Sequence, residues 1–259
     1  MTDFNGYIQT IRRAAKDALP KGYPFDISVI ENFNELRLHP KVTYLIGENG
    51  MGKSTLLEAV AVGLGFNAEG GTRNFNFSTQ ATHSNLHNYL KFTKGAHQPK
   101  DGFFLRGESF YNVASEIDEL DKQKPFEPLA GAPIINSYGG KSLHKQSHGE
   151  SFWALFMNRF GGNGVYILDE PESALSVTRQ MALLARINHL VNKRSQFIIA
   201  THSPIVLAYP DADIYQLTAS GLEKVPYRDT DIYRLYKGFL NNPENVTRLL
   251  LEEEEEYNS

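Results

Sequence analysis

The feature that most constrains the fold is a glycine-rich loop, Gly47–Ser54, with the sequence Gly-Glu-Asn-Gly-Met-Gly-Lys-Ser. An apolar run at residues 42–46 precedes the loop, and an amphipathic pattern at residues 56–64 follows it, so a predicted strand leads through the loop into a predicted helix. In this arrangement backbone N–H groups and the positive end of the helix can surround phosphate oxygens. The alternative is a glycine-rich turn without a ligand, which the flanking strand and helix disfavour. The pattern therefore predicts a phosphate-binding loop in an α/β fold.

The residues of this loop have distinct expected tasks. Lys53 is expected to reach the β- and γ-phosphates of a nucleotide as a point charge, and the Ser54 hydroxyl is expected to ligate Mg²⁺. Thr55 can contact the α-phosphate. The expected backbone contacts come from residues that approach the phosphates closely, which are Gly47, Asn49, Gly50 and Gly52. The loop therefore predicts a site for ATP and Mg²⁺.

Two carboxylates, Asp169 and Glu170, directly follow the apolar run at residues 165–168. Ligands of parallel α/β sheets bind at the carboxyl ends of the strands. We therefore expect Asp169 to hold Mg²⁺ through its water shell and Glu170 to orient or deprotonate an attacking water. The alternative is a solvated acid pair between a strand and a loop. A third apolar run, residues 197–200, leads to His202 at the same edge. A lone histidine more often has a structural role, but the alignment of three strand ends reverses that preference, so we expect His202 to contact the γ-phosphate.

A serine-glycine segment, Gln146–Ser151, lies upstream of the acidic strand. Ser147 and Glu150 have the spacing of a capping box that opens a helix, and this interpretation requires no nucleotide. A helix start that offers a serine hydroxyl and the close approach of Gly149 can also bind a γ-phosphate. Both interpretations can hold together.

The segments GENGMGKST, SHGES, ILDEPESAL and THSP, in this order, resemble the phosphate loop, signature, magnesium-and-base strand with D-loop, and switch histidine of ABC-type ATPases. The resemblance spans about residues 25–220. It implies a P-loop NTPase fold of ABC type, in which the signature of one subunit completes the ATP site of its partner. It therefore implies an ATP-dependent homodimer in which Ser147, Gly149 and Glu150 of the signature belong to the partner's ATP site. By the same resemblance, Ser173–Ser176 is the D-loop that crosses this interface.

The sequence departs from the family pattern at several positions. His148 stands where glycine is usual, and Ser176 stands where aspartate is usual. The glutamine of the family's lid has no clear counterpart, and its candidates are Gln80 and Glu108. The candidates for the aromatic residue that stacks on adenine are Tyr23, Phe25 and Phe33.

The order of the predicted elements gives the fold class. Apolar strands alternate with helices, which predicts an α/β fold whose sheet is largely parallel, with flanking helices, an antiparallel β part and an inserted helical lobe. We expect one domain over residues 1–259. Within it, we expect an N-terminal helical arm at residues 1–20, a strand at residues 25–30, an inserted lobe including the signature helix at residues 66–160, and C-terminal helices with an acidic tail at residues 229–259.

Composition and charge narrow the classes of protein that remain possible. A net charge of −4 gives no basic surface for nucleic acid over the whole chain, although a local basic patch is left open. No run approaches the ~18 apolar residues of a membrane span, and no signal peptide is evident, so a soluble cytoplasmic protein is expected. The absence of cysteine excludes disulfides and thiolate metal sites. His83 and His87 could share a helix face as metal ligands, but a structural role is preferred because no acid or cysteine is adjacent.

Three hypotheses about function follow. The first is a stand-alone ABC-type ATPase, resembling uncharacterised bacterial predicted ATPases related to recombination-repair and chromosome-structure ATPases. Its dimer would close on ATP, and the closed dimer would act on or with a nucleic-acid-processing or regulatory partner. The second is the nucleotide-binding subunit of a membrane ABC transporter, and the third is a defence- or toxin-linked ATP switch. The motifs do not identify the protein partner, and they leave nucleic acid open as one.

Overall fold

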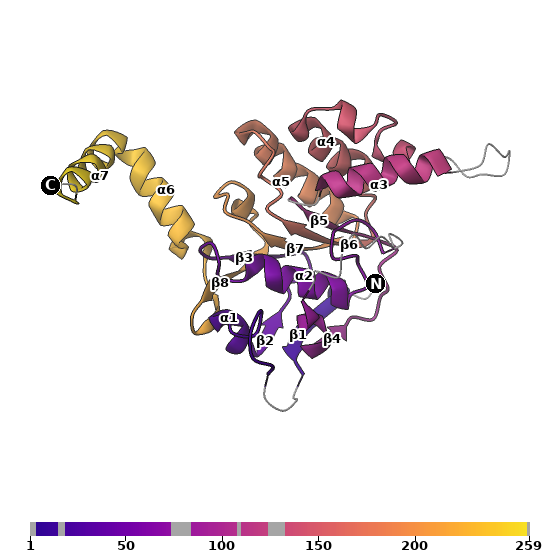
Figure 1. Ribbon diagram of the computed structural model, residues 1–259, viewed down its shortest axis with the longest axis horizontal. Helices are drawn as coiled ribbons and strands as arrows, with labels where there is room; N and C mark the ends of the chain where they lie inside the picture. Colours follow the sequence, from indigo (N-terminus) through magenta and orange to yellow (C-terminus); the bar gives the residue numbers. More distant parts are fainter. Residues whose placement is uncertain (1–3, 15–18, 74–83, 108–109, 124–132, 258–259) are drawn as a thin grey trace.

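The structure is a computed structural model that describes residues 4–14, 19–73, 84–107, 110–123 and 133–257. Its main body contains two sheets flanked by helices, and the C-terminal helices extend away from this body (Figure 1). The predicted α/β fold with a largely parallel sheet and an antiparallel part is confirmed.

The central sheet has six strands in the spatial order β5-β6-β7-β3-β8-β9. In this order they are β5 (Asp101–Arg106), β6 (Gly164–Asp169), β7 (Gln196–Ala200), β3 (Val42–Ile46), β8 (Ala212–Thr218) and β9 (Gly221–Lys224). Neighbouring strands run parallel except for β8 and β9, which are antiparallel. The carboxyl ends of β3, β5, β6 and β7 therefore lie along one edge of the sheet, where such sheets bind ligands.

The two faces of this sheet carry different helices, because alternate residues of a strand point to opposite faces. On one face, Tyr44 and Phe103 belong to a buried cluster with residues of α3, α4 and α5. On the other face, Leu45 and Phe104 belong to a cluster with residues of α2. The helices are α2 (Lys53–Gly63), α3 (Phe110–Gln123), α4 (His148–Ala154) and α5 (Val177–Asn192). Figure 1 shows α2 separated from α4 and α5 by the sheet.

Short helical segments connect these elements. They are α1 (Ser28–Glu31), η1 (Asn85–Tyr89), η2 (Ile134–Tyr138), η3 (Leu143–Lys145), η4 (Leu155–Arg159), η5 (Val206–Ala208) and η6 (Tyr227–Asp229). The segment η4 is π-helical and continues α4, and the side chain of Arg186 on α5 donates hydrogen bonds to the carbonyl oxygens of Phe156, Met157 and Phe160. The helix that begins at the predicted signature is thus attached to α5.

The N-terminal helical arm predicted at residues 1–20 is wrong over β1 (Ile8–Arg13), which is a strand. β1 pairs antiparallel with β2 (Glu35–Arg37) on one side and with β4 (Leu90–Lys94) on the other. Ile8 and Ile11, whose spacing suggested a helix, are both buried because the register with β4 shifts between residues 8 and 10. A bulge of this kind changes which residues face inward. Pairing with distant segments thus overrides the local periodicity.

Two further expectations need correction. Residues 25–30 do not form a strand; they form a turn that enters α1, and Val29 and Ile30 on this helix are buried. The described residues of the range 66–160 do not form one inserted lobe, because β4 joins the antiparallel sheet and β5 forms an edge of the central sheet. Among these described residues, the helical elements α3, η2, η3, α4 and η4 cover one face of the central sheet. Apolar runs as short as β4 and β5 do not reveal on their own which sheet they join.

Three residues proposed from the sequence lie outside the described residues: the lid candidates Gln80 and Glu108, and the potential metal ligand His83. His87 lies in η1, where its Nδ1 is 3.2 Å from the carbonyl oxygen of Ser84. Within the described ranges, no group of three or more metal-ligating side chains occurs.

Two helices, α6 (Asp231–Asn241) and α7 (Pro243–Tyr257), occupy the region where C-terminal helices were expected. They project away from the sheets (Figure 1). Their exposed large apolar side chains are Leu235, Tyr236, Phe239, Leu240, Leu249, Leu250 and Leu251. Over the part of the chain that the structure describes, no helix combines the length and the apolar character needed to cross a membrane.

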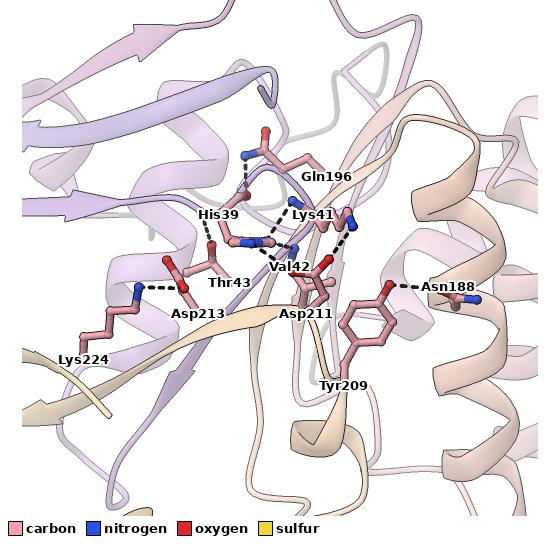
Figure 2. A network of polar contacts seen from close by, with 10 residues as sticks. All are labelled: His39, Lys41, Val42, Thr43, Asn188, Gln196, Tyr209, Asp211, Asp213 and Lys224. Carbon is pink, nitrogen blue, oxygen red and sulfur yellow. Dashed lines mark hydrogen bonds and ion pairs between the residues drawn. The ribbon is translucent and has the colours of Figure 1, made fainter. Parts of the chain in front are cut away.

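The amino ends of the central strands lie at the edge opposite the phosphate loop and are joined by polar contacts (Figure 2). Gln196, at the start of β7, is fully buried. Its Oε1 accepts hydrogen bonds from the backbone N–H groups of Tyr7 and Ile8, each at 2.9 Å. Its Nε2 donates to the carbonyl oxygens of Ile8 at 2.7 Å and His39 at 3.0 Å. One side chain thus connects the central sheet to the antiparallel sheet.

Replacing Gln196 with leucine is expected to lower the free energy of unfolding by about 3 kcal/mol, because buried backbone groups of Tyr7, Ile8 and His39 lose their partners. Urea unfolding followed by circular dichroism would measure the loss. Gln9→Leu is the matched control, because the Gln9 side chain on β1 is exposed. Equal stability of the two variants would show that Gln196 does not hold the sheets together.

Candidate nucleotide site

The glycine-rich loop connects β3 directly to α2, as its sequence predicts. Gly50 and Gly52 have φ angles of 80° and 88°, in the left-handed region that favours glycine. Gly52 also lies against α1 and the turn before it, and a Cβ there would be 3.1 Å from Ile27 Cγ2. Asn49 and Gly50 are exposed at the tip of the loop, and Gly47 is half-buried at its base. Glycine at positions 50 and 52 is thus required by the path of the backbone.

Lys53, the first residue of α2, lies under this loop and is 5% exposed. Its Nζ donates hydrogen bonds to the carbonyl oxygens of Gly47 and Glu48, both at 2.9 Å. Burial lowers the pKa of Lys53, while the negative charges of Glu170 and Asp169 act in the opposite direction. The lysine predicted from the loop and the acids predicted from β6 therefore lie near enough to interact.

Ser54 and Asp169 are adjacent although they are far apart in the sequence. Ser54 Oγ donates a hydrogen bond to Asp169 Oδ1 at 3.2 Å. Asp169 ends β6 and is 5% exposed, and it lies opposite Ala200 of β7 in the sheet. A hydroxyl and a carboxylate are oxygen ligands of the type that Mg²⁺ prefers. The two residues expected to hold Mg²⁺ thus fit that ion by their chemistry.

Glu170 and His202 follow the ends of β6 and β7 and face one another. Glu170 Oε1 lies 3.6 Å from His202 Nε2, and the two side chains are 44% and 37% exposed. The backbone of Glu170 has a φ of 48°, which is uncommon for a residue with a side chain, and its N–H donates to the carbonyl oxygen of Ala200. His202 Nε2 is itself buried and has no hydrogen-bond partner within the described residues. Strained backbone of this kind clusters at functional sites.

The sequence did not assign a role to Glu172, which the structure brings into this site. Its Oε1 accepts hydrogen bonds from the backbone N–H groups of His202 at 2.7 Å and Ser203 at 3.2 Å. Glu172 was visible only as a further carboxylate after the apolar run of β6. Its contact with the segment after β7 depends on the pairing of the two strands.

Ser147 and Glu150 form the capping interaction that their spacing suggests. Glu150 Oε2 accepts hydrogen bonds from the Ser147 backbone N–H at 3.0 Å and from Ser147 Oγ at 2.7 Å. The hydrogen bond from the Ser147 side chain lowers the pKa of the Glu150 carboxyl. Phe152 of α4 is buried in the cluster on the face opposite α2. The structure therefore does not bring Ser147 and Glu150 to the phosphate loop of the same chain.

Gly149 is needed where α4 approaches the segment predicted as the D-loop. A Cβ on Gly149 would lie 2.6 Å from the carbonyl oxygen of Ala174 and 3.1 Å from Arg179 Nη1. Ser176, which departs from the family's aspartate, is the N-cap of α5, and its Oγ accepts a hydrogen bond from the Arg179 backbone N–H at 3.4 Å. Serine is among the preferred residues at this position of a helix. The departure at Ser176 thus has a local structural explanation.

The three aromatic candidates for adenine stacking differ in exposure. Phe25 and Phe33 are 4% and 3% exposed and belong to the hydrophobic core, so their rings are not accessible to a nucleotide. Tyr23 is 71% exposed, and its hydroxyl lies 3.2 Å from Thr55 Oγ1 at the start of α2. Of the three, only Tyr23 is accessible beside the phosphate loop.

Family comparisons match two parts of the chain. A model described as "AAA domain, putative AbiEii toxin, Type IV TA system" matches residues 145–208, and a model described as "AAA domain" matches residues 25–124. A curated relative, ABC transporter E family member 1 of Arabidopsis thaliana, is 25% identical over 210 residues. This match covers 74% of the chain and 34% of the relative, so the chain spans about a third of the relative's length.

Comparison with solved structures matches the chain to an ATP-binding cassette of an ABC transporter and to an SMC head domain from Thermotoga maritima. The cassette has a TM-score of 0.52 and 16% identity, with 89% of this chain and 98% of the cassette covered. The SMC head domain has a TM-score of 0.41 and 14% identity, with 85% and 98% covered. The likeness to the cassette identifies the fold.

Proposed function

We propose that this chain, which has the fold of an ABC-type ATPase, binds ATP with Mg²⁺ and hydrolyses it. The observation that carries this proposal is the convergence of side chains from three strand ends. Lys53 and Ser54 follow β3, Asp169 and Glu170 come from β6, and His202 follows β7. A cation, a pair of oxygen ligands and an acid facing a histidine are the groups that phosphoryl transfer to water requires.

Each of these groups has a chemical task in the proposed reaction. The ammonium of Lys53 binds phosphate oxygens, for which it exchanges its contacts with the carbonyl oxygens of the loop. Ser54 and Asp169 would hold Mg²⁺, which neutralises charge on the phosphates when it is bound. Glu170 orients the attacking water and accepts its proton. The imidazole of His202, with its unpartnered Nε2 3.6 Å from Glu170, binds a γ-phosphate oxygen.

Hydrolysis is proposed to occur in a head-to-tail dimer that closes on ATP. The support is the position of Ser147, which is exposed at the start of α4, on the face of the sheet opposite α2. In one chain the signature cannot contribute to its own phosphate loop across the sheet. A second copy in the opposite orientation supplies Ser147, Gly149 and Glu150 to that loop.

A complementation experiment tests both the hydrolysis and the dimer. Lys53→Ala and Ser147→Arg proteins are each expected to be inactive alone, but their mixture is expected to regain ATP hydrolysis. The mixed dimer contains one site that combines an intact phosphate loop with an intact signature. Single-turnover release of phosphate from labelled ATP would measure the recovery.

The matched control is a mixture of Lys53→Ala with Glu170→Gln, which is expected to stay inactive. Both lesions lie on the phosphate-loop side of a site, so no combination of subunits restores one. Recovery in the control mixture, or none in the mixture with Ser147→Arg, would contradict the head-to-tail arrangement. Circular dichroism of each variant would verify that it is folded.

The proposed dimer acts on or with a nucleic-acid-processing or regulatory partner. The exposed apolar side chains of α6 and α7 support a protein contact there, since large exposed apolar surfaces mark interaction sites. A toxin-linked ATP switch is a second candidate, favoured by the description of the family model that matches residues 145–208. ATPase rates measured with and without DNA and RNA separate the two, because stimulation favours the first.

A further inference from the structure

The loop that carries His202 is hydrogen-bonded to the acidic segment that follows β6. The carboxylate of Glu172 accepts two backbone N–H groups from this loop, one from His202 at 2.7 Å and one from Ser203 at 3.2 Å. Hydrogen bonds to an ionised acceptor are stronger than those between neutral groups. The backbone of the histidine is therefore fixed by a residue two positions after the proposed catalytic base, Glu170.

A second tie joins the same loop to the predicted D-loop. Ser203 Oγ donates to Gln180 Oε1 at 2.7 Å, and Gln180 Nε2 donates to the carbonyl oxygen of Leu175 at 2.9 Å. Ser203 Oγ also accepts from the N–H groups of Ile205 and Val206. Both ties start within or next to residues 172–180, so a displacement of the D-loop would displace the loop of His202 as well.

The other oxygen of Glu172 has an unusual environment. Glu172 Oε2 is buried and has no hydrogen-bond partner within the described part of the chain. A buried oxygen without a partner costs free energy. If Glu172 served only to hold the histidine loop in place, a side chain with a single acceptor oxygen would serve as well and would avoid this cost. The negative charge of Glu172 acts on the Lys53 ammonium under the phosphate loop. The carboxylate thus contacts the backbone of the histidine loop and also interacts electrostatically with the phosphate-binding cation.

We infer that Glu172 is a positioning residue for His202, and that together with Gln180 it couples the D-loop to the histidine. This inference rests on the proposed ATPase function. In the dimer, movement of the D-loop against the second subunit would shift Glu172 and Gln180, and these would move His202 toward or away from the γ-phosphate. Closure of the interface and readiness for hydrolysis would then be linked within one subunit.

A double-mutant cycle tests this coupling. Glu172→Ala is expected to lower kcat for ATP hydrolysis about tenfold with KM changed by less than about twofold, because binding is retained and the histidine is misplaced. His202→Ala is expected to lower kcat at least as much. The double variant is expected to be no slower than His202→Ala, because a positioning residue has no effect once the group that it positions is gone.

Three comparisons make the test decisive. Glu172→Gln keeps one acceptor oxygen and is expected to recover part of the kcat lost in Glu172→Ala, and it replaces the alanine variant in the cycle if that variant does not fold. Glu223→Gln, at an exposed position on β9, is expected to match the wild type. The inference would be overturned if the losses of kcat in the two single variants multiplied in the double variant, or if Glu172→Ala raised KM with normal kcat. Either result would leave the ATPase assignment standing, provided that the wild type hydrolyses ATP. Absence of turnover in the wild type would overturn both.

Discussion

Replacing Glu170 with glutamine is expected to lower the rate of ATP hydrolysis at least about a hundredfold while ATP stays bound. Glutamine has nearly the same shape, but it cannot accept the proton of the attacking water. The hydrogen bonds of Lys53 and of the Ser54–Asp169 pair do not involve the side chain of Glu170, so ATP affinity is expected to persist. Single-turnover hydrolysis and direct titration with ATP would measure the two properties separately.

The same variant is expected to accumulate as a dimer in size-exclusion chromatography with ATP and Mg²⁺, because closure occurs and hydrolysis does not reopen it. Glu119→Gln is the matched control, since Glu119 is exposed on α3. The control is expected to hydrolyse ATP at the wild-type rate and to show no trapped dimer. A monomeric Glu170→Gln protein with unchanged turnover would refute the role of Glu170.

Replacing Lys53 with alanine is expected to weaken ATP binding by roughly a hundredfold or more, which is about 2.7 kcal/mol. Lys53 is the buried cation of the phosphate loop, and an alanine leaves the phosphate charges without it. Titration calorimetry with a slowly hydrolysed ATP analogue would measure the affinity. The binding loss is expected to exceed that of any substitution at the exposed tip of the loop.

The folded state is expected to survive this substitution. Burial lowers the pKa of Lys53, so the ammonium form is disfavoured in the folded protein and its removal relieves an electrostatic cost. This gain offsets the loss of the two hydrogen bonds from Lys53 Nζ to the carbonyl oxygens of Gly47 and Glu48, so thermal unfolding without ATP is expected near the wild-type temperature. Lys91→Ala, which changes an exposed residue of β4, is the control for loss of a positive charge. Unaltered ATP affinity in Lys53→Ala would contradict the assignment of the phosphate loop.

The parts of the fold that could be predicted are those with strong local patterns. The runs that became β3, β6 and β7 are mostly apolar and are buried along their whole length, since parallel strands covered on both faces have no side that faces water. Each ends in a polar segment, and parallel strands bring these segments to one edge of the sheet. Strand β1 was mistaken for a helix because its bulge gives buried residues a helical spacing. Strands β8 and β9 were not predicted, since their packing against β3 and each other is not visible in the local pattern.

The candidate site likewise contains residues that the sequence identifies and residues that only the structure reveals. The sequence was sufficient to identify Gly52 and Lys53 of the loop and the pair Asp169 and Glu170. Their chemistry is carried by residues that are adjacent or at fixed spacing in the chain. Glu172 was missed, since its partners lie on another strand's loop. For the adenine ring, three aromatic residues were equivalent in the sequence, and only their burial distinguished them.

The sequence by itself determined which chemistry is present: a phosphate loop, an acidic strand end, a histidine and a serine-glycine helix start. Local spacing is sufficient for this, because each motif is continuous in the chain. The tertiary structure alone decided which of these motifs meet. The sheet brings Ser54 to Asp169 and Glu170 to His202, but it separates Ser147 from the loop of its own chain. Contacts between distant segments depend on strand order and helix packing, which local patterns do not encode.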